Sequence, residues 1–600
     1  MISHNFNNQS KATVDGISLG TVVDYWEQSD WFSGSLRILR PFSWDAKDRG
    51  FEVVDLKIFA GSPIILVCGP YAAADAAAWN LDPLNDVGFP ESAEFDGVPY
   101  LLAGSPATVS DRYQDAAGWF TIEGPQQNGQ NRYISVAIDK SNTQLVLVLL
   151  KDGFLTLTLI LPTQIFDSEL GLELLDLPHM LIDSDIGDHL SGEANLRKVI
   201  IAAMPERARN YLAPLIVDTW GFGTNVNQEL VVSVAKCAED LGIEILTVDK
   251  GWELKVGDWL TNSEFSDGLQ GLATIARDRG TRLGLWIALG NADGLSDIAK
   301  KHPEWLATWR GKIQVVSHRN HSLCLGHAPV IDYLFKTLAH LAEQGMTWLL
   351  HDFETISRCD SKNHDHPPGM GEDWAVRGWY RLLTEFRQHF PDVWIENCWN
   401  GGRPLDLQVI AHHDTSIGDD WCDVRHNAVA KVGLGKYLPA HWCSSYMSDQ
   451  NDLPLRAQLA IYAVGGPWIL MGDIPHWSTE KLSLTKRVIA VYKSWRHLFA
   501  QGYVCWANLK GWDPDSRWRA DQEVLAISFV HPTGSELMAC TILEPLRTKE
   551  IFWYPRHIGP VMIRDEFSGV EFHLNADEVK KGIALSSTEM QGYLFSASPV

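Results

Sequence analysis

Cysteine is scarce in this sequence and is not arranged in pairs. Nine cysteines are scattered over 600 residues, and none forms a Cys-x-x-Cys motif. This usage is typical of a reducing compartment and excludes a disulfide framework. The first residues lack a basic segment followed by an apolar stretch, and the longest apolar runs are only as long as a strand. We therefore expect a cytoplasmic protein without a secretory signal or a membrane span.

Positive charge is also in short supply. The chain has 50 Lys and Arg against 75 Asp and Glu, which gives a net charge of -25. A surface of this sign repels nucleic-acid phosphates and anionic lipid headgroups, so we expect neither as a partner. No Gly-rich phosphate loop or Rossmann fingerprint follows an apolar run, so no nucleotide cofactor is expected. With 45% hydrophobic and 21% charged residues, the composition is that of an ordinary globular protein.

Three kinds of pattern follow one another along the chain, and 600 residues exceed what one core supports. Short β-branched and aromatic runs separated by Asp-Gly, Gly-Pro and Asn-Gly fill the first third, with a hairpin signal at Lys151-Asp-Gly-Phe154. Strand-like runs return near the C-terminus, as in Val524–Val530 and Glu550–Tyr554. We predict an N-terminal β-sandwich over residues 1–205 and a small C-terminal β-sandwich over residues 505–600.

Between these regions, over residues 206–504, apolar runs alternate with helical segments. The clearest runs are Leu215–Val217, Ile243–Val248, Leu283–Ile287, Thr347–Leu350, Val393–Ile395 and Trp468–Met471. Weaker candidates at Thr415–Gly418 and near Trp442 bring the total to about eight strands. The segment Val330–Glu343 has apolar residues three and four apart, as an amphipathic helix does. The pattern predicts a central (β/α)8 TIM barrel, with a doubly wound open sheet as the alternative.

Two aspartates each close a short apolar run. Asp352 ends the run that begins at Trp348, and Asp419 follows Ser416-Ile-Gly418. Parallel strands deliver the side chains at their C-terminal ends to a shared pocket. Tryptophans and carboxylates recur at the predicted strand ends, and a sugar pocket requires both, because indole faces stack on pyranose C–H groups while carboxylates bind hydroxyls. Two such aspartates indicate glycosidic bond chemistry.

Seven short motifs occur between residues 218 and 402. They are Asp218-Thr-Trp220, Val248-Asp-Lys-Gly-Trp252, Gly257-Asp-Trp259, Gly284-Leu-Trp286, Lys301-His-Pro-Glu-Trp305, Leu350-His-Asp352 and Glu396-Asn-Cys-Trp-Asn-Gly-Gly402. In kind and in order they are similar to motifs of glycoside hydrolase clan D, especially the family 36 α-galactosidases. The resemblance implies a three-domain, exo-acting, retaining α-glycosidase that needs no cofactor and acts on a glycoside or oligosaccharide. Members of that family are often homo-oligomers.

The resemblance also implies catalytic roles. Asp352 falls at the nucleophile position and Asp419 at the general acid/base position. Asp420 is a rival for the second role, because its spacing to Asp423 also matches the family, whereas the small Gly418 before Asp419 favours Asp419. In a retaining mechanism one carboxylate attacks the anomeric carbon, and the other protonates the leaving oxygen. The ionised nucleophile raises the pKa of its neighbour by like-charge repulsion.

A further set of residues is implied to bind the sugar: Trp220, Asp249, Lys250, Trp252, Trp286, His351, Glu396, Cys398, Trp399 and Arg403. Two of these depart from the family pattern. Relatives have an aspartate at the position of Lys250, and a Lys-Trp pair at the position of Leu350 and His351. Those positions usually contact galactose hydroxyls, so we expect a sugar other than plain galactose, either glucose-configured or carrying an anionic group.

Two histidine-rich segments contain the residue types that bind metals. They are His364-Asp-His366 and His412-His-Asp414. Neither has the His-x-x-x-His spacing that places two imidazoles on one helix face, and a loop with Pro367-Pro368 is typical of a solvated turn. The sequence therefore favours a protein without a metal site, and metal-dependent hydrolysis is a minor alternative.

Two other functions fit the same residues. A transglycosylase of the raffinose-synthase type uses identical carboxylates and differs in whether water or a sugar hydroxyl reaches the intermediate. A non-catalytic carbohydrate-binding protein on a glycosidase scaffold is suggested by Lys250 and His351. The presence of carboxylates at both chemical positions favours an enzyme.

Overall fold

The computed structural model spans residues 1–600. In residues 1–186 it describes the backbone of the strands and the side chains of Trp119, Ser135 and Ala137. From residue 187 onward it describes the chain except residues 188, 317–319, 353–358, 368–370, 400–401, 403–404, 419–422, 450–452, 511–522 and 547–550, and except the side chains of residues 189, 372, 373 and 429.

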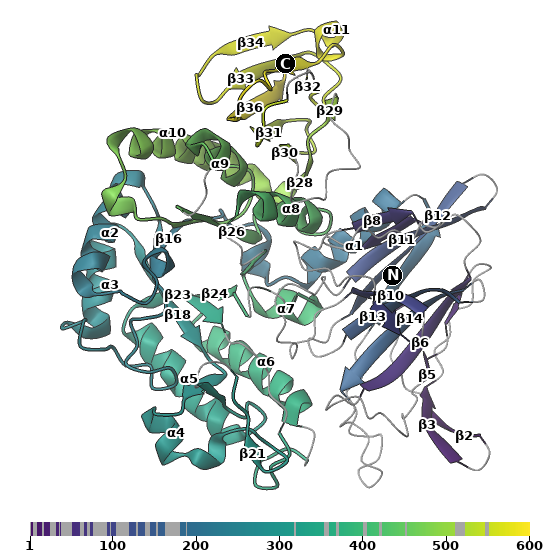
Figure 1. The fold of residues 1–600 in the computed structure, drawn as a ribbon, viewed down its shortest axis with the longest axis vertical. Helices are drawn as coiled ribbons and strands as arrows, with labels where there is room; N and C mark the ends of the chain where they lie inside the picture. Colours follow the sequence, from purple (N-terminus) through teal and green to yellow (C-terminus); the bar gives the residue numbers. More distant parts are fainter. Residues whose placement is uncertain are drawn as a thin grey trace.

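The centre of the molecule is a closed barrel of parallel strands (Figure 1). In barrel order these are β16 (Leu215–Asp218), β17 (Ile245–Val248), β18 (Arg282–Ala288), β23 (Met346–Asp352), β24 (Trp394–Asn397), β25 (Thr415–Ile417), β26 (Cys443–Ser448) and β27 (Trp468–Met471). The last strand pairs with the first and closes the ring. The strands are almost entirely buried because side chains fill the interior and helices cover the outside. The predicted barrel is confirmed, and each predicted strand lies in it.

Helices surround the barrel strands. They are α2 (Gln228–Leu241), α3 (Gly268–Asp278), α4 (Asp297–Lys301), α5 (Ala328–Glu343), α6 (Gly371–His389), α7 (Leu407–His412), α8 (Val424–Gly435), α9 (Leu455–Tyr462) and α10 (Thr479–Trp495). Helix α5 contains the predicted amphipathic segment and has a proline in its first turn, where no backbone N–H is needed. Helix α2 begins at the side-chain cap of Asn227 and ends at the left-handed Gly242, so local signals set both of its ends.

The N-terminal region consists of antiparallel sheets. One sheet has the order β1 (Ile2–Ser3), β15 (Met180–Ile186), β12 (Gln130–Ile138), β11 (Trp119–Gln127), β7 (Ile65–Cys68) and β8 (Ala72–Asp75). A second has the order β4 (Phe32–Gly34), β6 (Phe51–Phe59), β14 (Phe154–Pro162), β13 (Gln144–Lys151), β10 (Val98–Ala103) and β9 (Ala93–Phe95). A smaller sheet joins β2 (Gln9–Val14), β3 (Ile17–Val23) and β5 (Leu36–Arg37). The predicted hairpin is confirmed, because Lys151 pairs with Phe154 across β13 and β14.

Helix α1 (His189–Ala203) connects these sheets to the barrel. It packs against β11 and β12 on one side and contacts α7 on the other. Its Arg197 donates hydrogen bonds to the carbonyl oxygens of Gly435 and Lys436, at 3.2 and 3.0 Å. These carbonyls lie at the C-terminal end of α8, where no intrahelical donor remains for them. A side chain from α1 thus caps a barrel helix.

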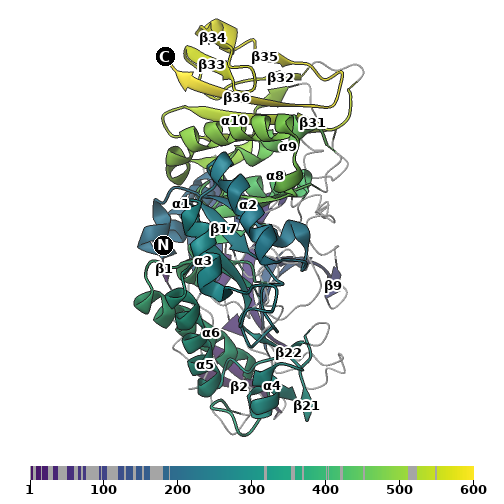
Figure 2. The ribbon, with the colours of Figure 1, turned by 90° about the vertical axis from the view of Figure 1, so that its left-hand side faces the viewer.

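The C-terminal region is a pair of smaller sheets. The larger has the order β28 (Tyr503–Trp506), β30 (Val524–Val530), β31 (Glu536–Ile542), β36 (Gln591–Pro599), β33 (Val561–Asp565) and β34 (Glu571–Leu574). The other joins β29 (Leu509–Lys510), β32 (Ile551–Trp553) and β35 (Ile583–Leu585), and a short helix, α11 (Ala576–Val579), precedes β35. These sheets lie beside α9 and α10 at one end of the molecule (Figure 2), and the Thr541 hydroxyl donates to the Ala457 carbonyl of α9 at 2.8 Å.

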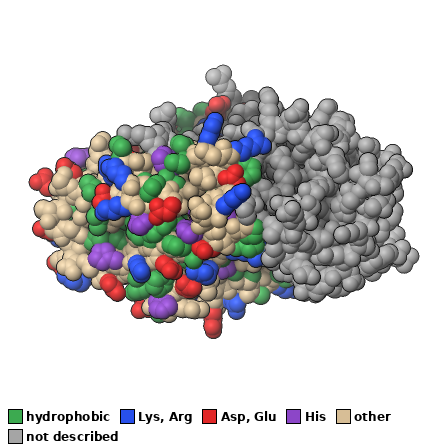
Figure 3. All heavy atoms as spheres, turned by 90° about the horizontal axis from the view of Figure 1, so that it is seen from below, with side chains coloured by type: hydrophobic (Ala, Val, Ile, Leu, Met, Phe, Trp, Pro, Cys, Tyr) green, Lys and Arg blue, Asp and Glu red, His purple; other side chains and the backbone are tan. Residues whose placement is uncertain are grey.

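Charged side chains are mixed on the surface that the structure describes. Seen from below, acidic, basic and histidine side chains alternate over the face that contains α4 and α5 (Figure 3). Among the described residues no helix combines the length and the apolar character needed to cross a membrane.

Candidate active site

Carboxylates gather at the C-terminal end of the barrel strands. Asp218 is the last residue of β16, Asp249 follows β17 directly, and Asp352 is the last residue of β23. Because the strands are parallel in one closed barrel, these residues lie at the same end. Burial raises the pKa of Asp249 well above its usual range, and the charges of Asp218 and Asp352 raise it further. The three carboxyl groups therefore interact electrostatically.

Asp218 and Asp249 form a carboxyl pair. They are both buried, and their side chains are hydrogen-bonded to each other. Burial raises the pKa of Asp218 to about 7. Two carboxylates this close in a buried site cannot both be ionised at low cost, so the pair shares a proton near neutral pH. Asp249 holds that proton, because its pKa is raised further by the charge of Asp218.

Backbone groups fix the carboxyl pair in place. The Trp220 N–H donates to Oδ1 of Asp218 at 2.7 Å, which makes Asp218 the N-cap of a short 3-10 helix. The Lys250 N–H donates to Oδ1 of Asp249 at 2.6 Å. Gly251 has φ of 120°, and a Cβ there would lie 2.6 Å from a backbone oxygen of the preceding loop. Only glycine lets the chain after Asp249 pass so close to that loop.

Asp352 is half-buried and is oriented by a tryptophan. The Trp286 indole Nε1 donates to Oδ2 of Asp352 at 3.1 Å. Trp286 lies on β18, the strand that pairs with β23. The Lys250 ammonium lies 5.5 Å from the centroid of the Trp286 ring. One indole therefore contacts both the carboxylate and a cation, which places Lys250 near Asp352.

A strained tryptophan supports this arrangement. Trp259 packs against Trp252 and Trp286, with ring centroids 6.2 and 6.1 Å apart. Its φ is 55°, which is rare for a residue other than glycine, and among the described residues its indole N–H has no hydrogen-bond partner. Backbone strain and unpaired buried donors collect at functional sites. This signal is independent of the carboxylates and lies next to them.

Glu396 belongs to the protein interior. It is 1% exposed, and Trp348 Nε1 and Ser444 Oγ each donate to one of its carboxyl oxygens at 2.7 Å. Burial raises the pKa of Glu396 to about 7. Because both oxygens already have protein donors, Glu396 holds β23, β24 and β26 together across the barrel interior.

The other predicted sugar-binding residues differ in exposure. Trp220 is 44% exposed. Trp252, His351 and Trp399 have no exposed surface, so a ligand contacts them only if their neighbours move. Trp379 Nε1 donates to Nε2 of His351 at 3.1 Å, and burial lowers the pKa of His351 to about 3. His351 is therefore neutral at physiological pH and offers no charge to a ligand.

Four further predictions concern Cys398, Arg403, Asp419 and Asp420. Cys398 is buried, and the Tyr446 hydroxyl donates to its Sγ at 3.8 Å. Arg403, Asp419 and Asp420 lie outside the described residues. Their roles, and the choice between the two aspartates, stay predictions.

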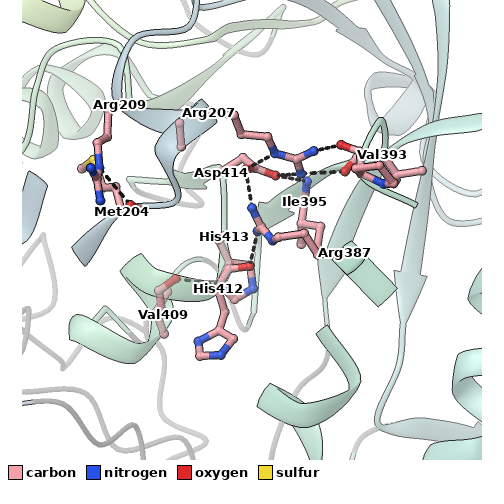
Figure 4. A network of polar contacts seen from close by, with 12 residues as sticks. Met204, Arg207, Arg209, Arg387, Val393, Ile395, Val409, His412, His413 and Asp414 are labelled. Carbon is pink, nitrogen blue, oxygen red and sulfur yellow. Dashed lines mark hydrogen bonds and ion pairs between the residues drawn. The ribbon is translucent and has the colours of Figure 1, made fainter. Parts of the chain in front are cut away.

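A different kind of carboxylate site lies at the opposite end of the barrel. Asp414 immediately precedes β25, and Arg207 and Arg387 approach its two oxygens at 2.6 and 2.8 Å (Figure 4). The Ile395 N–H donates to the same carboxylate at 2.8 Å. Asp414 has no exposed surface and is neutralised on both sides, as expected of a residue that stabilises the fold.

The two histidine-rich segments have different surroundings. Nδ1 of His412 and of His413 each bond a helix carbonyl, at 2.7 and 2.9 Å, and their neighbour Asp414 is held by arginines. His364 and His366 instead lie beside two cysteines. The ligand atoms of Cys324, Cys359, His364 and His366 are all within 4.8 Å of one another.

The predicted site residues include neither Asp218 nor Ser444, although Asp218 belongs to the first of the seven motifs. Asp218 ends an apolar run in the same way as Asp352, so the signal used for Asp352 also identifies it. Ser444 carries no comparable signal, because its partner Glu396 is 48 residues away in the sequence.

Curated relatives share the barrel segment. An α-galactosidase of Escherichia coli is 24% identical over 313 residues, which are 49% of this chain and 43% of that protein. The α-galactosidase AgaA of Geobacillus stearothermophilus is 24% identical over 307 residues, 48% of this chain and 42% of its own. The matched segment thus spans less than half the length of these relatives.

Solved structures share the fold. A variant of the same Geobacillus enzyme, a family 36 α-galactosidase crystallised with 1-deoxygalactonojirimycin, superposes with a TM-score of 0.72 at 17% identity. The match covers 92% of this chain and 78% of that one. A Lactobacillus brevis α-galactosidase gives a TM-score of 0.71, also at 17% identity, over 92% of this chain and 76% of its own.

The family model called Melibiase matches residues 194–502, which are just over half of the chain. That range begins in α1, includes every barrel strand and ends just before the C-terminal sheets. This protein therefore belongs to the Melibiase family.

Proposed function

We propose that this protein is a retaining, exo-acting α-glycosidase in which Asp352 is the nucleophile and Asp419 or Asp420 is the general acid/base. The observation that carries the proposal is the position of Asp352 at the C-terminal end of a barrel strand, next to a buried carboxyl pair, in a chain of the Melibiase family. Membership in the Melibiase family by itself supports glycoside hydrolysis as the reaction class. The carboxylates supply the groups that the reaction needs.

Each described residue has a role in this chemistry. The Trp286 indole donates to one oxygen of Asp352 and so orients this carboxylate for attack on the anomeric carbon. The pair formed by Asp218 and Asp249 offers a protonated and an ionised oxygen, so it can both donate to and accept from a sugar hydroxyl. Water then hydrolyses the glycosyl-enzyme, and the acid/base residue removes a proton from the attacking water.

The proposed substrate is an oligosaccharide or glycoside with a terminal α-linked sugar. A solved structure of the Geobacillus relative contains raffinose, which supports a galactose-like ring in the site. The proposed preference for a sugar other than plain galactose depends on Lys250 alone, because His351 is buried and neutral. An ammonium beside the Trp286 ring favours a sugar with an anionic substituent at the edge facing Lys250.

A panel of aryl α-glycosides tests the reaction and the sugar together. It compares α-galactosides, α-glucosides and α-galacturonides with the wild type and with Lys250→Met. We expect a charged substrate to lose most of its advantage in Lys250→Met while neutral ones change little. If plain α-galactosides are the best substrates of the wild type, the proposed preference for another sugar is wrong, although the glycosidase proposal stands.

Azide distinguishes the two carboxylate roles. With an activated aryl glycoside, azide should restore turnover of Asp352→Ala and give a glycosyl azide of inverted configuration. It should restore the acid/base variant, made at Asp419 or Asp420, and give retained configuration. No turnover of any glycoside by the wild type, combined with retained sugar binding, would instead favour a carbohydrate-binding protein. Transfer to added sugars in place of water would identify a transglycosylase.

A further inference from the structure

Two loops that leave neighbouring barrel strands meet at a cluster of thiols and imidazoles. Cys324 lies between β22 (Asn320–Ser322) and α5, in the long connection that follows β18. Cys359, His364 and His366 lie in the connection from β23 to α6. Figures 1 and 2 show α4, α5, α6 and β21 (Lys312–Ile313) grouped at this end of the molecule. The cluster therefore joins segments that are far apart in the sequence.

The distances within the cluster suit a tetrahedral metal site. Sγ of Cys324 is 3.2 Å from Nε2 of His366, and Sγ of Cys359 is 3.3 Å from Nδ1 of His364. Zinc bonds of about 2.3 Å to sulfur and about 2.0 Å to nitrogen give tetrahedral edges of about 3.3–3.8 Å. All four ligand atoms lie within 4.8 Å of one another. A zinc ion thus fits if the most distant ligand atoms approach one another by about 1 Å or more.

Backbone carbonyls select the tautomer that each imidazole needs. Nε2 of His364 lies 2.6 Å from the carbonyl oxygen of Glu304, and Nδ1 of His366 lies 2.9 Å from that of Pro367. A carbonyl only accepts, so each of these nitrogens carries the hydrogen. The lone pair is therefore on Nδ1 of His364 and on Nε2 of His366, the two atoms that face the cysteines. Such outer hydrogen bonds are typical of metal-bound histidines.

The apolar cluster that contains the two cysteines is small. Cys324 and Cys359 are 2% and 0% exposed, and the apolar cluster around them contains one further residue, Ala307. Across the two loops, the Asp360 N–H also donates to the Thr308 carbonyl at 2.8 Å. A small buried cluster with no large apolar side chains gains little from hydrophobic burial, which is where proteins use structural metals.

We propose that Cys324, Cys359, His364 and His366 bind one structural Zn²⁺ ion. Two thiolates and two imidazoles are a closed ligand set that leaves no coordination position for a substrate. On binding, each thiol releases its proton to solvent, so the dication meets two thiolates and the site becomes neutral. The ion joins the loop that follows Asp352 to the loop that follows β18. The proposal does not depend on the glycosidase activity.

The first test uses the wild-type full chain. Tag-free protein, purified without chelator from cells supplied with zinc, should contain one zinc per chain by plasma mass spectrometry. Cobalt added to metal-stripped protein should give a thiolate-to-cobalt charge-transfer band and the strong visible absorption of tetrahedral cobalt. Removal of the metal should lower Tm by at least about 5 °C, and zinc should restore it.

Variants locate the site. Cys359→Ser and His366→Ala should each lose the zinc. The double variant Cys324→Ser/Cys359→Ser should also lose the cobalt spectrum. Cys237→Ser and His340→Ala are the matched controls, because these residues lie on α2 and α5 outside the cluster, and both variants should retain one zinc.

Three results would overturn the proposal. The first is folded wild type that holds no zinc after supplementation and dialysis. The second is an unchanged zinc content in the cluster variants. The third is a thiol titration that shows Cys324 and Cys359 joined in a disulfide in protein purified without reductant. The wild-type measurements stay decisive even where a variant fails to fold.

Discussion

Buried carboxylates at the two ends of the barrel have opposite kinds of partners. At the N-terminal end, Asp414 is held between Arg207 and Arg387, and its charge is balanced. At the C-terminal end, Asp218 and Asp249 are hydrogen-bonded to each other, and among the described residues no lysine or arginine side chain is hydrogen-bonded to either. One end uses a carboxylate for stability, whereas the other tolerates like charges at a cost in stability.

This difference indicates where selection acts on function. A fold gains nothing from two buried acids in contact, because a neutral pair of similar shape would be more stable. Their presence at the end of the barrel where TIM-barrel enzymes place their catalytic groups supports the proposed active site. Changes at the two ends should therefore have opposite effects on stability and activity.

The largest expected effect is on catalysis. Asp352→Asn should lower kcat/KM for the preferred aryl glycoside by on the order of 10³–10⁵-fold, because the proposed nucleophile is lost. Thermal stability should stay the same or rise, since a charge near Asp249 is removed. Steady-state kinetics and a melting curve on the same sample check both. Full activity in this variant would exclude Asp352 as the nucleophile.

The next effect is on stability at the other end. Asp414→Asn should lower the free energy of unfolding by about 3–5 kcal/mol, because Arg207 and Arg387 lose the carboxylate between them. Activity per folded molecule should be kept. Urea unfolding measures the change. Glu239→Gln, which removes the exposed pair with Arg279, is the control and should change stability by less than about 1 kcal/mol. Equal losses in the two variants would contradict a special role for Asp414.

A smaller effect should depend on pH. The pKa of Asp218 is about 7 in the folded protein and near 4 when unfolded, so the folded chain keeps a proton that the unfolded chain releases. The stability linked to this group is full below about pH 4 and is lost as pH rises through about 7. Asp218→Asn removes that dependence. It should therefore be more stable than wild type at about pH 8, by up to about 4 kcal/mol, and close to wild type at about pH 4.

Denaturant unfolding at several pH values measures this dependence. Asp278→Asn is the matched control, because that carboxylate is exposed on the surface of α3 and its replacement should not alter the dependence on pH. A constant difference between wild type and Asp218→Asn at all pH values would show that the carboxyl pair does not share a proton.

The smallest expected effect concerns Glu396. Ser444→Ala removes one of its two donors and should lower the free energy of unfolding by about 1–2 kcal/mol. Ser494→Ala is the control, since the Ser494 hydroxyl bonds a carbonyl within its own helix. Chemical denaturation distinguishes the two. A Ser444→Ala variant as stable as the control would mean that Trp348 alone satisfies Glu396.

The barrel was predictable because each of its strands is a local signal. Runs such as Leu215–Val217 and Trp468–Met471 are short, apolar and followed by polar residues. This pattern can be recognised in the sequence without information on tertiary contacts. The hairpin at Lys151 and Phe154 was predictable for the same reason, since its turn residues are adjacent in the sequence.

The contacts between side chains were not predictable in this way. The sequence places His366 far from Cys324, and only the folded loops bring them together. The spacing His364-Asp-His366 does not predict a metal site, because it lacks the His-x-x-x-His pattern that places two imidazoles on one helix face. His364 and His366 face the cysteines through different ring nitrogens, Nδ1 and Nε2. The burial of His351 likewise depends on Trp379, which lies on a helix 28 residues away.

Helix α1 also bears on how the protein can be divided. The boundary predicted at residue 205 would remove this helix from a catalytic fragment, and with it the guanidinium that caps α8. The carbonyl oxygens of Gly435 and Lys436 would then lose the hydrogen bonds from Arg197. We expect a shortened protein to fold well only if it starts before His189, so the independent unit is larger than the barrel itself.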